Sequence, residues 1–189
     1  MDEARTAFHF YGLMQEGLGL DMKDPNLKDT PKRVAKMFCQ EFFSGLTSTI
    51  PKITTFPNSE KYTGIILLDN IPFTSVCSHH FLPFFGEAHF LYIPDRYLIG
   101  ASKVSRLIAH CSARPHIQEQ LTQQIVNIFV SVVGPLGVML IMRAKHGCMT
   151  CRGIKQEGGL VTSVVYGSFA ENLSTREEGM ELIKLSERG

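Results

Sequence analysis

The chain has 189 residues, 44% of them hydrophobic and 20% charged, which is ordinary for a globular protein with a packed core. Its formal net charge of +1 excludes the global basic field that is typical of nucleic-acid-binding proteins, so we expect no nucleic-acid partner. Any anionic ligand must therefore be bound by a local cluster of cations.

Cysteine usage and hydropathy indicate a cytoplasmic protein. The five cysteines are an odd number and the N-terminal residues are acidic and polar, so we expect reduced thiols that serve a metal or catalysis. Residues 120–142 contain no charge, but Asn127 and Gly134-Pro135 interrupt them. These interruptions predict a helix end, a turn and a new strand, so we expect no membrane span.

The first third of the chain predicts helices followed by a linker. Mixed spacing of three and four between apolar residues indicates a helix over 3–17. Thr30 as N-cap and Pro31 at the first helical position predict a second helix, which runs to Gly45. Residues 46–61 are rich in proline and typical of a linker.

The linker predicts two parts, an N-terminal helical arm over 1–50 and a domain over 51–189. Arg33 and Lys36 lie three residues apart on the second helix of the arm, and hence on one side of it. The residue types alone indicate no more than a solvated face.

Strand patterns surround the first chemically distinctive segment. Residues 64–68 and 73–76 predict strands that lead into Cys77, and 87–93 predicts a further strand that ends at Pro94. Cys77 is thus expected at a strand end or hairpin, where a sheet holds side chains rigidly.

A cationic stripe follows on a helix that opens at residues 100–103 with Ser102 as its N-cap. Lys103, Arg106 and His110 are spaced i, i+3 and i+7, so they share one side that begins at the helix N-terminus. Backbone N–H groups, helix dipole and side-chain charge all favour phosphate there. The spacing of a Walker A loop is absent.

The remaining elements complete an α+β pattern. Pro115 predicts the start of a helix whose first turn holds Gln118 and Glu119, where an acidic residue ordinarily complements the dipole. Strands are predicted over 137–144 and 160–169. A final helix over 174–185 begins with a capping-box pattern, Ser174-Thr175-Arg176-Glu177. The order of elements favours an antiparallel sheet.

Two segments carry ligand chemistry, Cys77-x-x-His80 and Cys148-x-x-Cys151. Four ligands would close a structural zinc site, whereas three would leave one position for the water of a catalytic zinc. A Cys-x-x-Cys pair also suits thiol exchange without a metal. The spacing alone leaves these three interpretations open.

Two additional histidines favour the catalytic interpretation. His79 adjoins one presumed ligand and His146 lies two residues from another, so both must be near the metal. A closed structural site has no use for two imidazoles, whereas hydrolysis needs general acids and bases that act near pH 7. The alternative is that they only hydrogen-bond groups around the ligands.

Six segments closely resemble the GTP cyclohydrolase I family, and the resemblance extends from about residue 5 to residue 185. They are Thr30–Met37, Phe43–Leu46, Cys77–Phe81, Ile99–Arg106, Arg114–Ile125 and His146–Gly153. The resemblance implies a tunnelling fold, an antiparallel sheet with helices packed on one face, that assembles into a toroidal homodecamer with active sites at subunit interfaces. It also implies zinc-dependent conversion of GTP to formate and 7,8-dihydroneopterin triphosphate, which begins pterin and tetrahydrofolate biosynthesis.

The resemblance further assigns roles to individual positions. The zinc ligands match Cys77, His80 and Cys148. Proton transfer matches His79 and His146, guanine binding matches Glu119 with Gln118, and ribose contact matches Ser102. The triphosphate group matches Lys103, Arg106, Arg152, Arg33 and Lys36. Five cations suit a triphosphate, which carries about four negative charges near neutral pH.

Two positions depart from the family pattern. Ser78 stands where the family usually has Glu, which removes a carboxylate near the metal and raises the alternative of an enzyme that acts on GTP but stops at another product. Cys151 is unusual beside Cys148 and raises the alternative of a non-catalytic, structural zinc protein. We expect Cys148 to bind the metal and Cys151 not to bind it.

Overall fold

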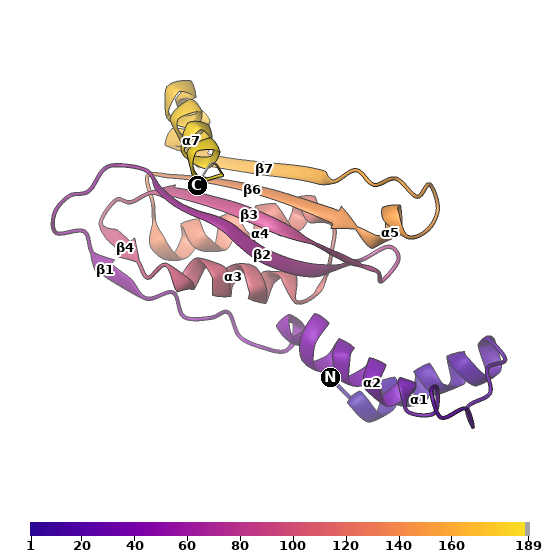
Figure 1. Ribbon diagram of the computed structural model, residues 1–189. Helices are drawn as coiled ribbons and strands as arrows, with labels where there is room; N and C mark the ends of the chain where they lie inside the picture. Colours follow the sequence, from indigo (N-terminus) through magenta and orange to yellow (C-terminus); the bar gives the residue numbers. More distant parts are fainter. Residues whose placement is uncertain (188–189) are drawn as a thin grey trace. The chain divides into compact units, whose positions relative to one another are not determined.

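The computed structural model describes residues 1–187, so the last two residues of the expected domain 51–189 lie outside the described part. The chain divides into two compact units, Met1–Thr49 and Ile50–Gly189 (Figure 1). The first contains helices, and the second contains the sheets together with the helices that pack on them.

The first unit is built from two interrupted helices. Its elements are α1 (Glu3–Gly12), the π-helical η1 (Leu13–Gly17), α2 (Thr30–Lys36), the π-helical η2 (Met37–Phe42) and the 3₁₀ turn η3 (Ser44–Leu46). Phe38 stacks on Phe10 with ring centroids 5.6 Å apart, which ties the two helices together. The helix expected over 3–17 is confirmed as α1 with η1. Asp29 rather than Thr30 occupies the N-cap position, because Thr30 is already the first helical residue.

A five-stranded sheet in the order β5-β2-β3-β6-β7 forms the frame of the second unit. Its strands are β2 (Ile66–Cys77), β3 (Pro83–Ile93), β5 (Pro115–His116), β6 (Gly137–His146) and β7 (Leu160–Gly167). Neighbours are antiparallel except β5, which runs parallel to the end of β2. The predicted strands 64–68 and 73–76 form one strand, β2, whose register shifts between Leu68 and Ile71. The α+β class with an antiparallel sheet is confirmed.

Two helices, α3 (Ser102–Ser112) and α4 (Gln118–Val133), cover one face of this sheet (Figure 1). Alternate residues of β3 point to them, and Phe90 packs edge-on against Phe129 of α4 with ring centroids 4.7 Å apart. The intervening Leu91 belongs to a smaller cluster on the opposite face, which α6 (Ser168–Glu171) and α7 (Leu173–Ser186) cover. The predicted helical layer on one face is therefore confirmed, with α7 as an addition on the other.

Three predicted helix starts are shifted. The helix expected from Pro115 begins at Gln118, because Pro115 and His116 extend the sheet as β5. Ser102 is the first residue of α3 rather than its cap. Asn172 caps α7, because its Oδ1 accepts hydrogen bonds from the backbone N–H groups of Ser174 and Thr175. The prediction of a capping box that begins at Ser174 is therefore wrong.

The uncharged run 120–142 is divided between α4 and β6. Gly134 ends α4 in the left-handed conformation, with φ of +63°, and β6 begins three residues later. The predicted helix end, turn and strand are confirmed. Within residues 1–187, none of the helices combines the length and the apolar character that crossing a membrane requires.

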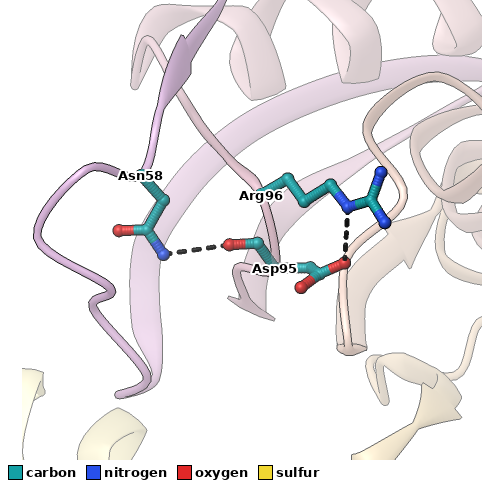
Figure 2. Close-up of polar contacts among 3 residues, drawn as sticks. All are labelled: Asn58, Asp95 and Arg96. Carbon is teal, nitrogen blue, oxygen red and sulfur yellow. Dashed lines mark hydrogen bonds and ion pairs between the residues drawn. The ribbon is translucent and has the colours of Figure 1, made fainter.

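A second, two-stranded sheet pairs β1 (Thr55–Pro57) with β4 (Tyr97–Ile99). Figure 2 shows how a side chain closes this element: the Asn58 amide donates to the carbonyl oxygen of Asp95 at 3.0 Å. The Asp95 carboxylate in turn lies 4.0 Å from the Arg96 guanidinium. The segment 46–61, expected as a linker, thus contributes a strand to the second unit.

Candidate metal centre

The first ligand segment is a tight turn between β2 and β3. The Cys77 N–H donates to the carbonyl oxygen of Leu82 at 2.8 Å, and the Phe81 N–H donates to that of Cys77 at 2.9 Å. Phe81 takes a left-handed conformation, with φ of +54°, to close this turn. The chain therefore curls back, and His80 Nδ1 lies 3.9 Å from Cys77 Sγ.

The second ligand segment follows β6 directly. His146 is the last residue of β6, and the short helix α5 (Gly147–Thr150) carries Cys148. β6 pairs with β3 so that His146 stands opposite Phe84, at the same end of the sheet as the first turn. Two segments about seventy residues apart thus meet because they follow β2 and β6, which flank β3 and end at the same end of the sheet.

Three ligand atoms converge there. The sulfurs of Cys77 and Cys148 and a ring nitrogen of His80 lie within 4.8 Å of one another. Bonds of roughly 2.0–2.3 Å from one ion would span such distances. Among residues 1–187, no other three His, Cys, Asp or Glu side chains gather in this way. The donor set therefore fits a single borderline-soft cation.

The surroundings of the Cys148 thiol oppose its ionisation. Burial raises the pKa of the Cys148 thiol, and its hydrogen bond to Cys77 raises it further. The nearby Arg152 charge acts in the opposite direction. Because a metal binds the thiolate, its binding must release protons from this pair.

Cys151 lies outside the three-ligand group. Its side chain is exposed, and its Sγ donates to the carbonyl oxygen of Gly147 at 2.7 Å. The structure thus brings together three of the four residues in the two Cys/His motifs. A closed four-ligand site is not formed.

The two extra histidines lie in different surroundings. His79 is exposed, and its ring stands nearly perpendicular to that of His80, at 85°. His146 is buried, and its ring stacks on Phe84 with centroids 4.5 Å apart. Burial lowers the pKa of His146, while the negative charge of Glu119 partly raises it. The His146 ring is therefore held neutral near pH 7.

Gln118, the first residue of α4, bonds to His146 and to other residues of β6 and β7. It is 1% exposed, its Oε1 lies 2.8 Å from His146 Nε2, and its Nε2 donates to the carbonyl oxygen of Met142 at 2.9 Å. Thr122 and Thr162 complete this buried network. Neither threonine is among the site residues predicted from the sequence. The signals that could have indicated them are the i, i+4 spacing of Gln118 and Thr122 and the polar Thr162 in the apolar strand β7.

The residues predicted to bind the ribose and the triphosphate are distributed over three parts of the chain. Ser102, Lys103 and Arg106 lie in the first turns of α3, and Ser102 lines a cavity of about 400 Å³ with Tyr92 and others. Arg152 follows α5 and is exposed. For the described residues, no hydrogen bond or ion pair connects those three α3 residues to the metal ligands.

Arg33 and Lys36 belong to the first unit, on α2, and both are exposed. The Arg33 guanidinium donates to the carbonyl oxygen of Asn26 at 3.1 Å and to the Thr30 hydroxyl at 3.1 Å. Arg33 is thus held against its own loop, while its exposure keeps it accessible to an anion.

Fold and site together define an α+β protein with a mainly antiparallel sheet, a candidate Cys–His–Cys metal centre and a buried neutral histidine beside it. The profile of the family described as GTP cyclohydrolase I matches residues 9–184. The chain is 41% identical over 170 residues to GTP cyclohydrolase 1 of Haemophilus ducreyi, covering 89% of this chain and 78% of that protein. It is 40% identical over 173 residues to GTP cyclohydrolase 1 of Carboxydothermus hydrogenoformans, covering 90% of each.

The chain therefore belongs to the GTP cyclohydrolase I family and is an enzyme that hydrolyses GTP. The family predicted from the sequence is confirmed. A solved structure of the archaeosine synthase QueF-like protein in its apo form aligns with a TM-score of 0.40 at 17% identity, covering 53% of this chain and 92% of that one.

Proposed function

We propose that zinc is the metal bound by Cys77, His80 and Cys148, and that the chain converts GTP to formate and 7,8-dihydroneopterin triphosphate. This is the first step of pterin and tetrahydrofolate biosynthesis. The observation that carries the proposal is the convergence of two thiols and one imidazole within 4.8 Å. Sulfur and imidazole ligands suit zinc, and three protein ligands are the number that catalytic zinc sites keep.

When bound, zinc supplies a Lewis acid that lowers the pKa of water to roughly 7, as hydrolysis at guanine C8 requires. The protein holds the ligand side chains in place around the metal. Cys77 is buried at the end of β2 and fixed by backbone bonds, whereas His80 is exposed and leaves the solvent side accessible to substrate.

His146 and His79 are proposed to move protons during ring opening and the later rearrangement. Because its pKa is lowered, the buried ring of His146 is unprotonated near pH 7 and keeps a lone pair that can accept a proton. His79 is exposed beside a ligand and can exchange protons with both substrate and water. Two acid–base groups suit a reaction that hydrolyses two bonds and closes a new ring.

Substrate recognition is proposed for charged and polar groups around this centre. Glu119 is exposed one residue after Gln118 and presents a carboxylate to the N–H groups of guanine. Ser102 is proposed to contact the ribose. The triphosphate is proposed to meet five cations: Lys103, Arg106, Arg152, Arg33 and Lys36. The N-terminus of α3 adds its dipole to the first two.

We further propose that residues 1–50 act as a helical arm and that 51–189 form the catalytic domain of a cytoplasmic protein. The chain is proposed to assemble into a toroidal homodecamer with active sites at subunit interfaces. The edge strand β7 supports assembly, because it exposes Val161 and Tyr166 beside backbone groups that another chain can pair. Light scattering should give a mass close to ten chains of 21.2 kDa.

The activity is tested by supplying metal-stripped protein with zinc and GTP. We expect one zinc per chain by elemental analysis, formate release, and a fluorescent pterin after oxidation. The Cys148→Ser variant, prepared identically, should show none of these. Absence of formate from the unmodified chain would overturn the proposal, and formate without pterin would favour the alternative product that Ser78 suggests.

A further inference from the structure

Gln118 and His146 form a buried pair whose hydrogen-bond direction is determined by the surrounding groups. We propose that Gln118 is a positioning residue that fixes His146 as the Nε2–H tautomer, which leaves the ring lone pair on Nδ1. The inference deepens the proposed function, because it rests on His146 acting in proton transfer.

The first step is the orientation of the Gln118 amide. One outer atom faces the backbone carbonyl oxygens of Met142 at 2.9 Å and Leu160 at 3.3 Å, as well as the Thr162 hydroxyl at 3.1 Å. The other faces the His146 ring nitrogen at 2.8 Å. A carbonyl oxygen only accepts hydrogen bonds, so the amide nitrogen must face Met142. The amide oxygen is left facing His146.

The second step concerns the ring. Because the Gln118 oxygen also only accepts, His146 Nε2 must carry a hydrogen to bond with it at 2.8 Å. In a neutral imidazole the other nitrogen then holds the lone pair. Nδ1 of His146 is therefore the basic atom.

Two threonines hold the amide in this orientation. Thr122 donates its hydroxyl proton to the backbone carbonyl oxygen of Gln118 at 2.7 Å, so this proton is not available to Thr162. Thr162 lies 2.6 Å from the Thr122 hydroxyl and must therefore donate to it. The Thr162 oxygen can then accept the second amide proton of Gln118, at 3.1 Å. Reversing the amide would leave several buried polar groups without partners.

The same contacts argue against direct guanine binding by Gln118. Its side chain is 1% exposed, and both its nitrogen and its oxygen bond to the protein. Glu119, the next residue, is exposed and remains the group for guanine. Gln118 and Glu119 therefore have different roles in this proposal: Gln118 acts through His146, and Glu119 binds guanine.

Solid-state NMR of zinc-loaded protein labelled with ¹⁵N-histidine measures the tautomer directly. Signals that disappear in His146→Ala identify the ring. At slightly alkaline pH we expect a hydrogen on Nε2 and none on Nδ1. Gln118→Met keeps the side-chain volume without the amide, so we expect mixed tautomers and a kcat lowered about tenfold, while KM for GTP stays within about twofold.

Two further variants sharpen the test. Gln118→Glu keeps an acceptor for Nε2–H whether its carboxyl is ionised or protonated, so the wild-type tautomer should persist. Gln123→Met makes the same replacement on the exposed side of α4 and should change neither the spectrum nor kcat.

A hydrogen on Nδ1 in the wild type, or an unchanged tautomer in Gln118→Met, would overturn the inference. A raised KM with an unchanged tautomer would assign Gln118 to guanine instead. If circular dichroism shows Gln118→Met to be unfolded, the ¹⁵N spectra of the wild type and Gln118→Glu test the inference instead, because both must show the hydrogen on Nε2 of His146. If the wild type releases no formate, the proposed function fails while the tautomer is still read from its spectrum.

Discussion

Gly147 approaches Pro83 so closely that a Cβ at Gly147 would stand 3.0 Å from the Pro83 carbonyl oxygen. This contact joins the start of α5 to the start of β3 and thereby sets the distance between the two ligand segments. Gly147→Ala should displace α5 by a few tenths of an ångström and lower zinc affinity about tenfold, as changes around metal ligands typically do. Competition with a chromogenic chelator measures this affinity.

Gly12→Ala provides the matched control for that substitution. Nothing lies within 4 Å of the added methyl group there, and the site is the end of α1 in the first unit. Zinc affinity should not change in this variant. Equal losses in the two glycine variants would show that the contact with Pro83 does not govern the metal centre.

The two cysteines of the second segment should respond differently to replacement by serine. Cys148→Ser removes one of three converging ligands, so zinc retention and turnover should fall below detection. Cys151→Ser replaces an exposed thiol that bonds to Gly147, and the serine hydroxyl can make the same bond. Zinc content after dialysis and formate release should therefore stay near wild type. Loss of the metal from Cys151→Ser would mean that the centre uses four ligands.

Replacing the buried histidine should separate binding from chemistry. His146→Ala leaves Cys77, His80 and Cys148 in place, so zinc content should be retained. Turnover should fall by roughly two or more orders of magnitude, the range for lost acid–base catalysis. The exposed His9 on α1 supplies the control, since His9→Ala should alter neither quantity. A zinc-loaded His146→Ala with normal turnover would exclude the proposed proton transfer.

The sequence predicted the parts of this site that depend on local spacing. Cys77 is expected at a strand end because apolar runs precede it, and β2 ends at Cys77. The strand predicted over 137–144 is confirmed as β6, which ends at His146, two residues before Cys148. Pro115 predicts a helix start, since proline favours that position. Its parallel pairing with Val76, thirty-nine residues earlier, overrides this preference.

The hydrogen-bond network around Gln118 was not predictable by the same means. Its partners Met142 and Thr162 are twenty-four and forty-four residues away, on two different strands. Local periodicity contains no information on which strand neighbours a helix turn. The sequence therefore indicated that Gln118 is important without indicating that it bonds to His146.

The last prediction concerns stability and pH. The Arg114 guanidinium lies 3.2 Å from His110 Nε2 and can only donate, so this nitrogen must be unprotonated. Burial first, and then the Arg114 charge, lower the pKa of His110 below its ordinary value of about 6.5. Because the unfolded chain then binds the proton more readily, the contribution of His110 to stability is complete above about pH 6.5 and is lost as pH falls towards the folded pKa.

The unfolding temperature, measured between about pH 7.5 and about pH 5.5, tests this direction of the pH dependence. The midpoint temperature of unfolding should fall on acidification. In His110→Gln an amide oxygen can accept from Arg114 without titrating, so the midpoint should fall less over the same interval. Burial also lowers the pKa of His116, so the variant should retain part of the slope. Identical slopes in both proteins would show that His110 does not contribute, and a midpoint that rises on acidification would contradict the lowered pKa values.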